Sequence, residues 1–344
     1  MFESVMGIGT RAVSNILCSF YFSFAILAFA ATSLAQSVTD EVHIQPLVTG
    51  SAPSASSLTD PSLKLPEKSL KVDVDLVLLP VSITDVYGRP VVGLDKSRFE
   101  VFEGKEEQEI RHFSSEDAPM SVGIILDSSG SMKEKAERAR EAVVEFCRVS
   151  NPQDEFFLIT FNDSPQEVAG FTSRVEDIQN RLVFTQPKGR TALFDAIYLG
   201  LNQLKKARYS RKALLIVSDG GDNHSRYTER EVRSQVEEAD VLIYAIGLYD
   251  HTFQTPEERL GPIVLRDISE VTGGRTFTVD DPNTLPTVAA LIATELRNQY
   301  VLGYRPAASS HDGKWHKVKV KMKMPKGFSL LQIHSRTGYY ASAQ

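Results

Sequence analysis

Closely spaced oxygen-bearing side chains follow an apolar run near the middle of this 344-residue chain. Asp127, Ser129 and Ser131 stand at positions 1, 3 and 5 of a loop that comes directly after the apolar residues 122–126. One carboxylate and two hydroxyls at this spacing can converge on a single hard cation, and Mg²⁺ and Ca²⁺ prefer such oxygen ligands. The loop therefore predicts a metal site whose remaining positions are filled by water or by an oxygen of a partner.

Two later segments carry matching oxygen donors. Thr191 stands at the start of a helix-like stretch, and Asp219 ends a second apolar strand. In an open parallel sheet, ligands bind beyond the carboxyl ends of the strands, so we expect both acidic strand ends at one edge. Serine and aspartate also cap helix ends in ordinary loops. Capping could account for Asp127 or Ser129 taken alone, but it does not explain why oxygen donors occur in three segments that converge.

Three further residues are candidates for supporting roles. Asp195 lies one helical turn beyond Thr191 and could steady that loop through hydrogen bonds. Asp222 and His224 follow Asp219 and are candidates for contact with metal-bound water or with a partner, although such turn formers are also ordinary in surface connections. No catalytic residue is predicted, because the sequence offers neither a serine with an oriented base nor a phosphate-loop signature.

This set of residues resembles the von Willebrand factor A (VWA) domain with its metal-ion-dependent adhesion site. The resemblance covers roughly residues 118–298, where Met132 and residues 272–275 also agree. It implies that the serines and the threonine bind the metal directly and that the aspartates bind it directly or through water. An acidic side chain of a partner would fill the open position. The implied cation is Mg²⁺, with Mn²⁺ or Ca²⁺ as alternatives. The implied metal ligands are Asp127, Ser129, Ser131, Thr191 and Asp219.

Between residues 118 and 298, apolar strand-like runs alternate with helix-like segments. This alternation predicts an α/β fold, a doubly wound and mostly parallel sheet of Rossmann-like type with helices on both faces. We expect strands at 122–126, 156–161, 213–217, 241–247 and 275–279. We expect helices at 133–149, 175–182, 193–207, 229–238, 264–271 and 285–297.

The segments that flank this domain, 71–117 before it and 299–344 after it, are predicted to form β-strands. Strands are expected at 98–103 and 108–113, with a turn at 103–105, and at 300–304, 315–322 and 328–334. Each flank has too few strands for a stable sandwich alone, so we expect the two to pair into one β-sandwich, with two separate β units as the alternative. The whole of 70–342 is similar to VWA-related proteins annotated mainly in Acidobacteria, through segments such as 81–91, 99–104, 300–304 and 336–340.

The N-terminal residues 1–35 carry Arg11, then an uncharged apolar stretch that ends in Ser33-Leu34-Ala35. This pattern is typical of a signal peptide cleaved after Ala35, and its length also allows an uncleaved membrane anchor over residues 12–35. Residues 36–70 are rich in Ser, Pro and Thr, which predicts a disordered linker. The protein is therefore expected in the periplasm or outside the cell.

The overall composition is that of a globular protein with about two domains, and the net charge of −6 gives no support to nucleic-acid binding. Lysines alternate with apolar residues over 315–323, as on a strand with one solvated face. A basic patch for an anionic partner over 314–326 is the less favoured alternative. Cys147 lies on a predicted helix and is expected to be a small buried hydrophobe.

Together these features predict an exported, metal-dependent adhesion or protein-interaction protein, not an enzyme. Its partner would be a protein that supplies Asp or Glu to the cation. The alternatives are an assembly or regulatory subunit of a cell-envelope complex and, less favoured, a metallohydrolase. Motion of the predicted helix 285–297 could transmit the metal state to the β-sandwich, by analogy with other A domains.

Overall fold

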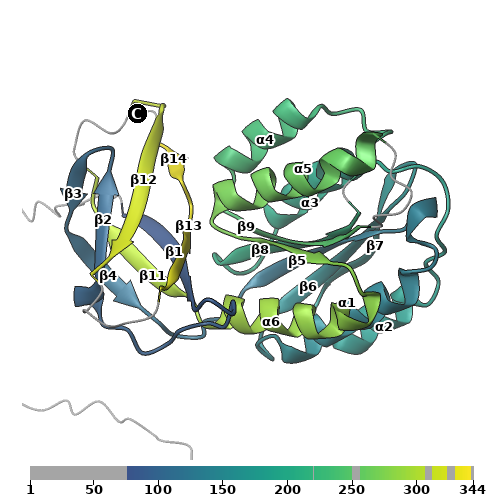
Figure 1. Ribbon diagram of the computed structural model, residues 1–344, viewed down its shortest axis with the longest axis horizontal. Coiled ribbons are helices and arrows are strands. Elements are labelled where there is room, and N and C mark those ends of the chain that lie inside the picture. Colours follow the sequence, from purple (N-terminus) through teal and green to yellow (C-terminus); the bar gives the residue numbers. More distant parts are fainter. Residues whose placement is uncertain (1–75, 220, 250–255, 307–311, 324–329, 342–344) are drawn as a thin grey trace, which may run out of the picture. The chain divides into compact units, whose positions relative to one another are not determined.

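The computed structural model describes residues 76–219, 221–249, 256–306, 312–323 and 330–341, which belong to one compact unit. The expected signal segment 1–35 and linker 36–70 lie outside these residues. No helix in the described ranges is long and apolar enough to span a bilayer. Figure 1 shows a layered α/β domain beside a pair of small sheets.

A six-stranded sheet of order β10-β9-β8-β5-β6-β7 forms the centre of the α/β domain. All neighbouring strands are parallel except β7, which runs antiparallel to β6 at one edge. The central strands are apolar throughout because helices cover both faces. The strands are β5 (Ser121–Asp127), β6 (Glu155–Phe161), β7 (Pro165–Thr172), β8 (Lys212–Ser218), β9 (Leu242–Leu248) and β10 (Thr276–Val279).

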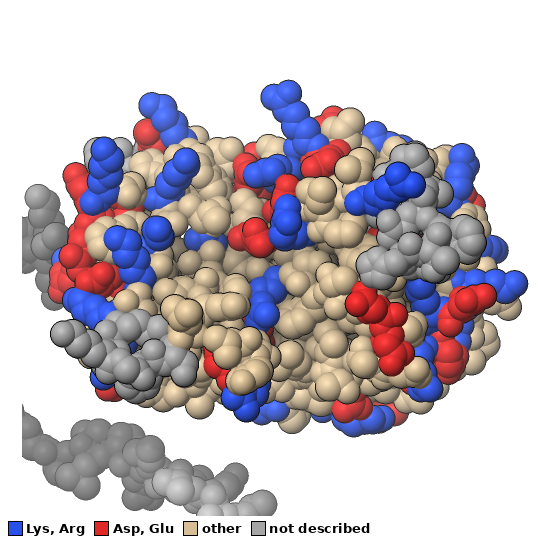
Figure 2. Space-filling model, in the orientation of Figure 1, with Lys and Arg blue, Asp and Glu red and all other residues tan. Residues whose placement is uncertain are grey.

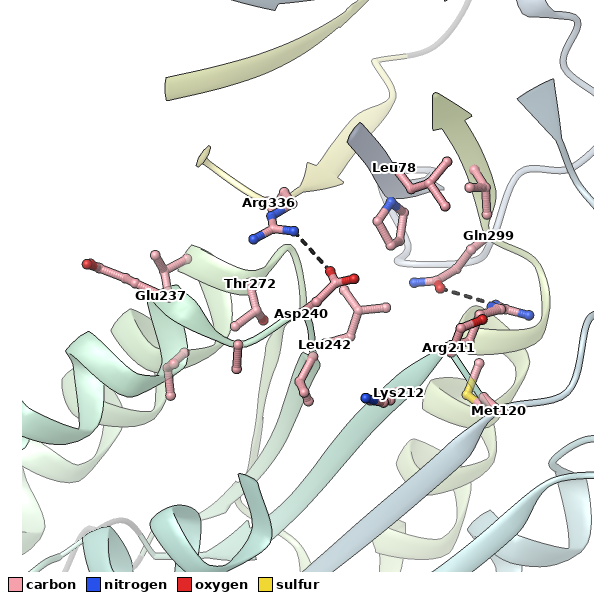
Figure 3. Close-up of a pocket in the computed structure, with 17 residues that line it drawn as sticks. Leu78, Met120, Arg211, Lys212, Glu237, Asp240, Leu242, Thr272, Gln299 and Arg336 are labelled. Carbon is pink, nitrogen blue, oxygen red and sulfur yellow. Dashed lines mark hydrogen bonds and ion pairs between the residues drawn. The ribbon is translucent and has the colours of Figure 1, made fainter. Parts of the chain in front are cut away.

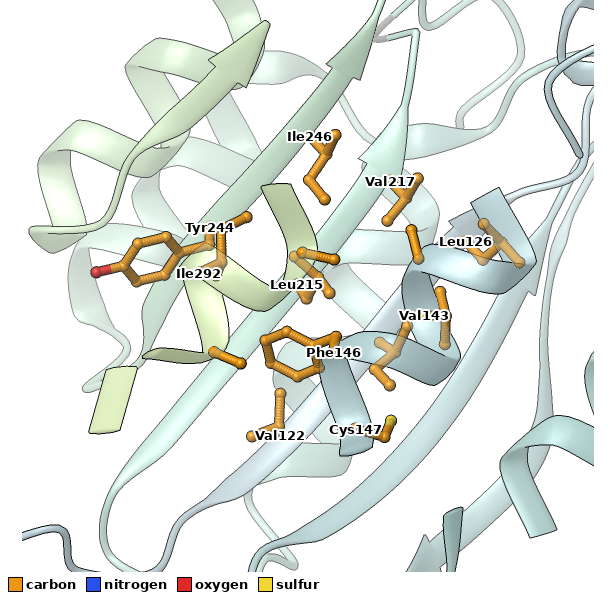
Figure 4. Packing of buried hydrophobic residues seen from close by; sticks show 14 of the residues in the cluster. Val122, Leu126, Val143, Phe146, Cys147, Leu215, Val217, Tyr244, Ile246 and Ile292 are labelled. Carbon is orange, nitrogen blue, oxygen red and sulfur yellow. The ribbon is translucent and has the colours of Figure 1, made fainter. Parts of the chain in front are cut away.

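Two hydrophobic cores lie on opposite faces of this sheet. One core is covered by α1 (Ala136–Val149), α2 (Val175–Leu182) and α6 (Leu285–Arg297). Figure 4 shows part of it, where Phe146 and Val143 of α1 pack against Val122 and Leu215 of the sheet. The other core is covered by α3 (Leu193–Leu204), α4 (Glu229–Glu238) and α5 (Pro256–Thr272). The predicted α/β class is confirmed.

The flanks on either side of this domain pair into a β-sandwich around a third core. One sheet has the order β13-β1-β11-β4 and the other β14-β12-β2-β3, so each mixes strands from both flanks. The predicted pairing of the flanks is therefore confirmed. The strands are β1 (Val77–Thr84), β2 (Phe99–Glu103), β3 (Glu106–Gln108), β4 (Ile110–Ser114), β11 (Tyr300–Tyr304), β12 (Trp315–Met322), β13 (Gln332–Ser335) and β14 (Gly338–Tyr340).

The expected strand over 108–113 is wrong as a single element. The chain instead leaves β3 and enters β4, which belong to different sheets. Alternation in sequence cannot reveal this switch, because both short strands keep the period of two. The strand β7 was not predicted either, and its mostly part-exposed residues explain why, since an edge strand needs no continuous apolar run.

Two helix starts also differ from the prediction. α1 begins at Ala136 because a short 3₁₀ turn, Gly130–Met132, comes first, and Met132 is fully buried there. α5 begins at Pro256, well before the expected residue 264. Cys147 on α1 is buried, and burial raises the pKa of its thiol far above the usual range, as expected for an inert thiol.

The lysine-rich strand β12 keeps one face in solvent. Val318 and Val320 are buried in the sandwich core, whereas Lys317, Lys319 and Lys321 between and beside them are exposed. Figure 2 shows basic and acidic side chains interspersed over the visible face of the molecule, not gathered by sign. The predicted solvated strand face is confirmed.

A buried polar network joins the α/β domain to the sandwich. Glu295 of α6 is fully buried, accepts a hydrogen bond from Tyr244 of β9 (2.9 Å) and pairs with Arg275 (2.9 Å). From β1 of the sandwich, the Ser82 hydroxyl lies 3.3 Å from the Tyr244 hydroxyl and accepts from Gln299 (3.1 Å). The end of α6, which leads directly into β11, is thus fixed to both bodies.

In the sandwich, His316 lies between the carboxylates of Glu103 and Asp312, an arrangement called the His316 clasp below. The ring nitrogens of His316 on β12 lie 2.8 Å from a Glu103 oxygen and 3.0 Å from an Asp312 oxygen. The hydrogen bond to Asp312 is the largest cause that raises the pKa of His316, against the effect of burial and with a smaller contribution from Glu103. The protonated ring can donate to both carboxylates at once.

Candidate metal centre

The carboxyl ends of β5 and β8 bring two buried aspartates to one edge of the sheet. Leu126 pairs with Val217, so Asp127 comes opposite Ser218, the residue that precedes Asp219. The Ser218 hydroxyl donates to Asp127 Oδ2 at 2.6 Å. Asp127 is 3% exposed and Asp219 is 4% exposed, which places both carboxylates under the surface of the loops.

The first loop folds back on its own carboxylate. The Ser129 backbone N–H donates to Asp127 Oδ1 at 2.8 Å, a local turn that aspartate forms readily. The hydroxyls of Ser129 and Ser131 lie 3.1 Å apart. Ser129 is buried while Ser131 is exposed, so the three predicted donors of this loop run from the interior to the surface.

The second loop is bound to the first through its main chain. The Gly130 N–H donates to the Gly189 carbonyl (3.1 Å), and the Lys188 N–H donates to the Ser128 carbonyl (2.9 Å). Gly189 has a φ of 76°, and a Cβ built on it would lie 2.4 Å from an Asp163 oxygen. A glycine is needed here because other residues rarely adopt this φ and because a side chain would meet Asp163.

The third loop holds Thr191 from the other side. The Asn223 side-chain oxygen accepts from the Thr191 N–H at 3.0 Å, and the Thr191 carbonyl accepts from the N–H groups of Asn223 and His224. Thr191 itself is 4% exposed. The first and second loops, and the second and third, are therefore joined pairwise by backbone hydrogen bonds, which gathers the three predicted segments at one edge.

The electrostatics of this edge favour a cation. Burial is the largest cause that raises the pKa of Asp127 above its usual range, and the nearby charge of Asp219 raises it further, against hydrogen bonds from Ser129 and Ser218. The same two causes, burial first and then Asp219, raise the pKa of Tyr249. Two buried carboxylates that repel each other among hydroxyls fit a hard divalent ion.

The donor set fits such an ion by its chemistry: two carboxylates and three hydroxyls, all oxygen. Among the described residues, no group of three or more His, Cys, Asp or Glu side chains could hold a metal. The set predicted here contains only two residues of those types. Its hydroxyl-rich character favours Mg²⁺, Mn²⁺ or Ca²⁺ over a metal that needs nitrogen or sulfur ligands.

The three supporting candidates occupy different places. Asp195 Oδ1 accepts from the N–H groups of Arg226 (2.8 Å) and Tyr227 (3.1 Å), so it fixes the far end of the third loop and not the Thr191 loop itself. Asp222 Oδ1 accepts from Ser225 N–H, whereas its Oδ2 is buried without a hydrogen-bond partner in the described part of the chain. The His224 ring contacts the Arg190 guanidinium at 2.8 Å.

Sequence reasoning missed two residues that position the site. Ser218 donates to Asp127, and its place directly before an acidic strand end was an available signal. Asn223 orders the Thr191 backbone, a role that no sequence pattern indicates because the two residues are 32 positions apart.

The structure is a doubly wound α/β domain with a cluster of oxygen-bearing side chains at the carboxyl edge of its sheet. Residues 122–221 match the family model of the von Willebrand factor type A domain. Over these residues, the match confirms the resemblance to the VWA domain that the sequence implied.

A curated relative and several solved structures share this similarity. The chain is 26% identical over 135 residues to inter-alpha-trypsin inhibitor heavy chain H4 of Bos taurus, a match covering 34% of this chain and 15% of that protein. The von Willebrand factor type A structure from Catenulispora acidiphila is 13% identical, with a TM-score of 0.47 over 80% of this chain and 75% of that one. Proximal thread matrix protein 1 from the mussel byssus, with a zinc-occupied metal-ion-dependent adhesion site, is 17% identical, with a TM-score of 0.45 over 56% of this chain and 49% of that one.

Proposed function

We propose that this chain is an exported protein-binding protein that captures its partner through a divalent cation. Asp127, Ser129, Ser131, Thr191 and Asp219 would hold the ion, and an aspartate or glutamate of the partner protein would complete its coordination. Mg²⁺ is the preferred ion, with Mn²⁺ and Ca²⁺ as alternatives.

The observation that carries this proposal is the pair of buried carboxylates at neighbouring strand ends. Asp127 and Asp219 are each under 5% exposed, and each ionised group opposes ionisation of the other. Buried charges are stable when they are paired or coordinate a metal. A bound cation would reduce the repulsion between these two carboxylates at this edge of the sheet.

The distribution of burial supports a partner that approaches from the loop side. Asp127, Ser129, Thr191 and Asp219 are buried, and Ser131 is exposed. Mg²⁺ demands nearly octahedral coordination and usually keeps positions that water or a ligand fills. A carboxylate from a partner would enter on the exposed side, and its charge would be attracted by the ion.

Binding is favoured over hydrolysis by the surroundings of the hydroxyls. A serine nucleophile needs a base in hydrogen-bond reach. Ser129 and Ser131 lie near each other and Asp127, while the ring of His224, a histidine of the third loop, contacts Arg190. Within the described ranges, no imidazole is hydrogen-bonded to either serine, which supports coordination of a ligand over proton transfer.

Export is the second part of the proposal and rests on the charge and hydropathy of residues 1–35. Mass spectrometry of the protein recovered from its native cells tests it directly. A mature N-terminus at Gln36 supports cleavage, an intact segment in the membrane fraction supports an anchor over residues 12–35, and an intact protein in the cytosol contradicts export.

Calorimetric titration of Mg²⁺ and Mn²⁺ into the full chain tests the metal site. Asp127→Asn keeps the size of the side chain and removes its charge, and Asp95→Asn changes an exposed carboxylate on the sandwich as a control. We expect saturable binding in the wild type and in Asp95→Asn, and its loss in Asp127→Asn. Equal binding in all three proteins would place the ion elsewhere and refute the site.

A further inference from the structure

A cavity of about 110 Å³ lies at the junction of the α/β domain and the sandwich, at the edge of the sheet opposite the candidate metal centre. Its walls include Met120, which precedes β5, and the first residues of β8 and β9, Lys212 and Leu242. Leu78 and Val301 come from the sandwich. Figure 3 shows these two bodies facing each other across the space.

The cavity exists because the α/β domain covers only part of the β1 face that is turned toward it. Alternate residues of this strand face the α/β domain, and Ser82 on that face is only 1% exposed, held by Tyr244 and Gln299. Leu78, four residues earlier on the same face, is 44% exposed. The two bodies touch at Ser82 and separate toward Leu78, which leaves an apolar wall open to a ligand.

The charged side chains around this cavity differ in whether they have a hydrogen-bond or ion-pair partner. Arg336 pairs with Asp240 at 2.9 Å, and Arg211 donates to Gln299 and to two backbone carbonyls, all neutral acceptors. The side-chain ammonium of Lys212 has no hydrogen-bond or ion-pair partner within the described ranges, and the residue is only part-exposed. In the view of Figure 3 its ammonium lies on the α/β wall between Arg211 and Leu242.

We propose that this cavity binds a small monocarboxylate with an aromatic or branched aliphatic body, its carboxylate on Lys212 and its apolar part against Leu78 and Val301. Two carboxylates also line the cavity, but Glu237 pairs with Arg233 and Asp240 with Arg336. The positive charge of Lys212 beside Arg211 is therefore left to select an anion. The apolar walls select a body without further polar groups. An apolar cavity of ~150 Å³ takes up benzene. This cavity of about 110 Å³ is smaller but opens beside the exposed Leu78, so it suits one ring or one branched chain.

This site is independent of the metal proposal, because it uses the opposite ends of the same strands. A ligand there would touch both bodies beside the Ser82–Glu295 network and would favour one arrangement of the junction. Ligand binding should therefore raise the thermal stability of the full chain by mass action.

Titration of sodium benzoate into the full chain, followed by ligand-observed NMR, tests the proposal, with benzamide as the uncharged analogue. We expect saturable benzoate binding, with benzamide roughly tenfold weaker because it loses the charge-assisted hydrogen bond. Lys212→Gln should weaken benzoate to the level of benzamide. Leu78→Trp, at an exposed position, should fill the space and block both ligands. Lys319→Gln removes an exposed lysine on β12 and should change nothing.

The outcomes separate this site from the metal centre. Unchanged Mg²⁺ binding in Lys212→Gln and Leu78→Trp would show that both variants fold. Absence of saturable benzoate binding in the wild type would overturn the proposal, as would equal benzoate affinity in Lys212→Gln and wild type. Loss of Mg²⁺ binding in Asp127→Asn with benzoate binding intact is the expected result for two separate sites.

Discussion

The buried pair of Glu295 and Arg275 gives the sharpest test of how the two bodies are joined. The Glu295 side chain is 1% exposed and that of Arg275 is 18% exposed, so the pair is almost wholly removed from water. Breaking a buried ion pair by removing one charge costs about 3–5 kcal/mol, while a neutral hydrogen bond contributes about 1 kcal/mol net. Glu295→Gln keeps an acceptor for Tyr244 and removes the charge, and Arg275 still reaches water. We therefore expect a loss of about 2 kcal/mol in the free energy of unfolding.

Urea unfolding of the full chain measures this loss, with two probes that report different parts of the structure. Trp315, the single tryptophan, lies on β12 and packs against the α/β core under α3, α4 and α5, so its fluorescence reports the junction, whereas far-UV circular dichroism reports mainly the helices of the α/β domain. In the wild type the two transitions should coincide. In Glu295→Gln they should separate, because the variant weakens the network that joins the bodies.

Glu141→Gln is the matched control. Glu141 pairs with Arg138 on the surface of α1, with both side chains more than 40% exposed, and such pairs contribute less than about 0.5 kcal/mol. If Glu295→Gln were destabilised no more than this control, the network would be a contact without energetic consequence, and the account of the junction given above would be refuted.

Three further predictions, the first with a control substitution, test the second loop, the sandwich and the start of α4. Gly189→Ala should cost about 1–2 kcal/mol for its left-handed φ and should also weaken Mg²⁺ binding in calorimetry. Gly93→Ala, with a φ of 78° and no atom within 4 Å of the added Cβ, should show the cost of the φ in thermal melts but leave Mg²⁺ binding unchanged. The clasp at His316 has a raised pKa when folded, so its stabilisation is full below the ordinary histidine pKa of about 6.5 and is lost as the pH rises through the folded value. Melting temperatures of wild type and His316→Gln should therefore differ at pH 5.5 and converge by pH 8.5; a constant difference would contradict this. Thr228→Ala removes the capping box that begins α4 and should cost about 1 kcal/mol in urea unfolding, and no change would mean that water replaces the cap.

Local patterns in the sequence were sufficient to predict the α/β domain and the candidate metal ligands at the carboxyl edge of its sheet. Apolar strands alternating with amphipathic helices specify a doubly wound sheet, because helices must cover both faces of parallel strands. Once β5 and β8 are recognised, their acidic ends must lie at the same edge, since parallel strands share a direction. This is why Asp127 and Asp219 could be paired from a sequence in which they are 92 residues apart.

Tertiary structure alone decided what depends on contacts between distant segments. The switch from β3 to β4 between sheets, the support of Thr191 by Asn223, and the fixing of Glu295 by Arg275 and Tyr244 carry no periodic signal. The cavity beside Lys212 arises because the α/β domain covers Ser82 of β1 and leaves Leu78 uncovered, a property of how two packed bodies meet. Sequence periodicity shows which face of a strand or helix is apolar. How deeply each residue of that face is buried depends on the shapes of both packed bodies, which the sequence pattern does not show.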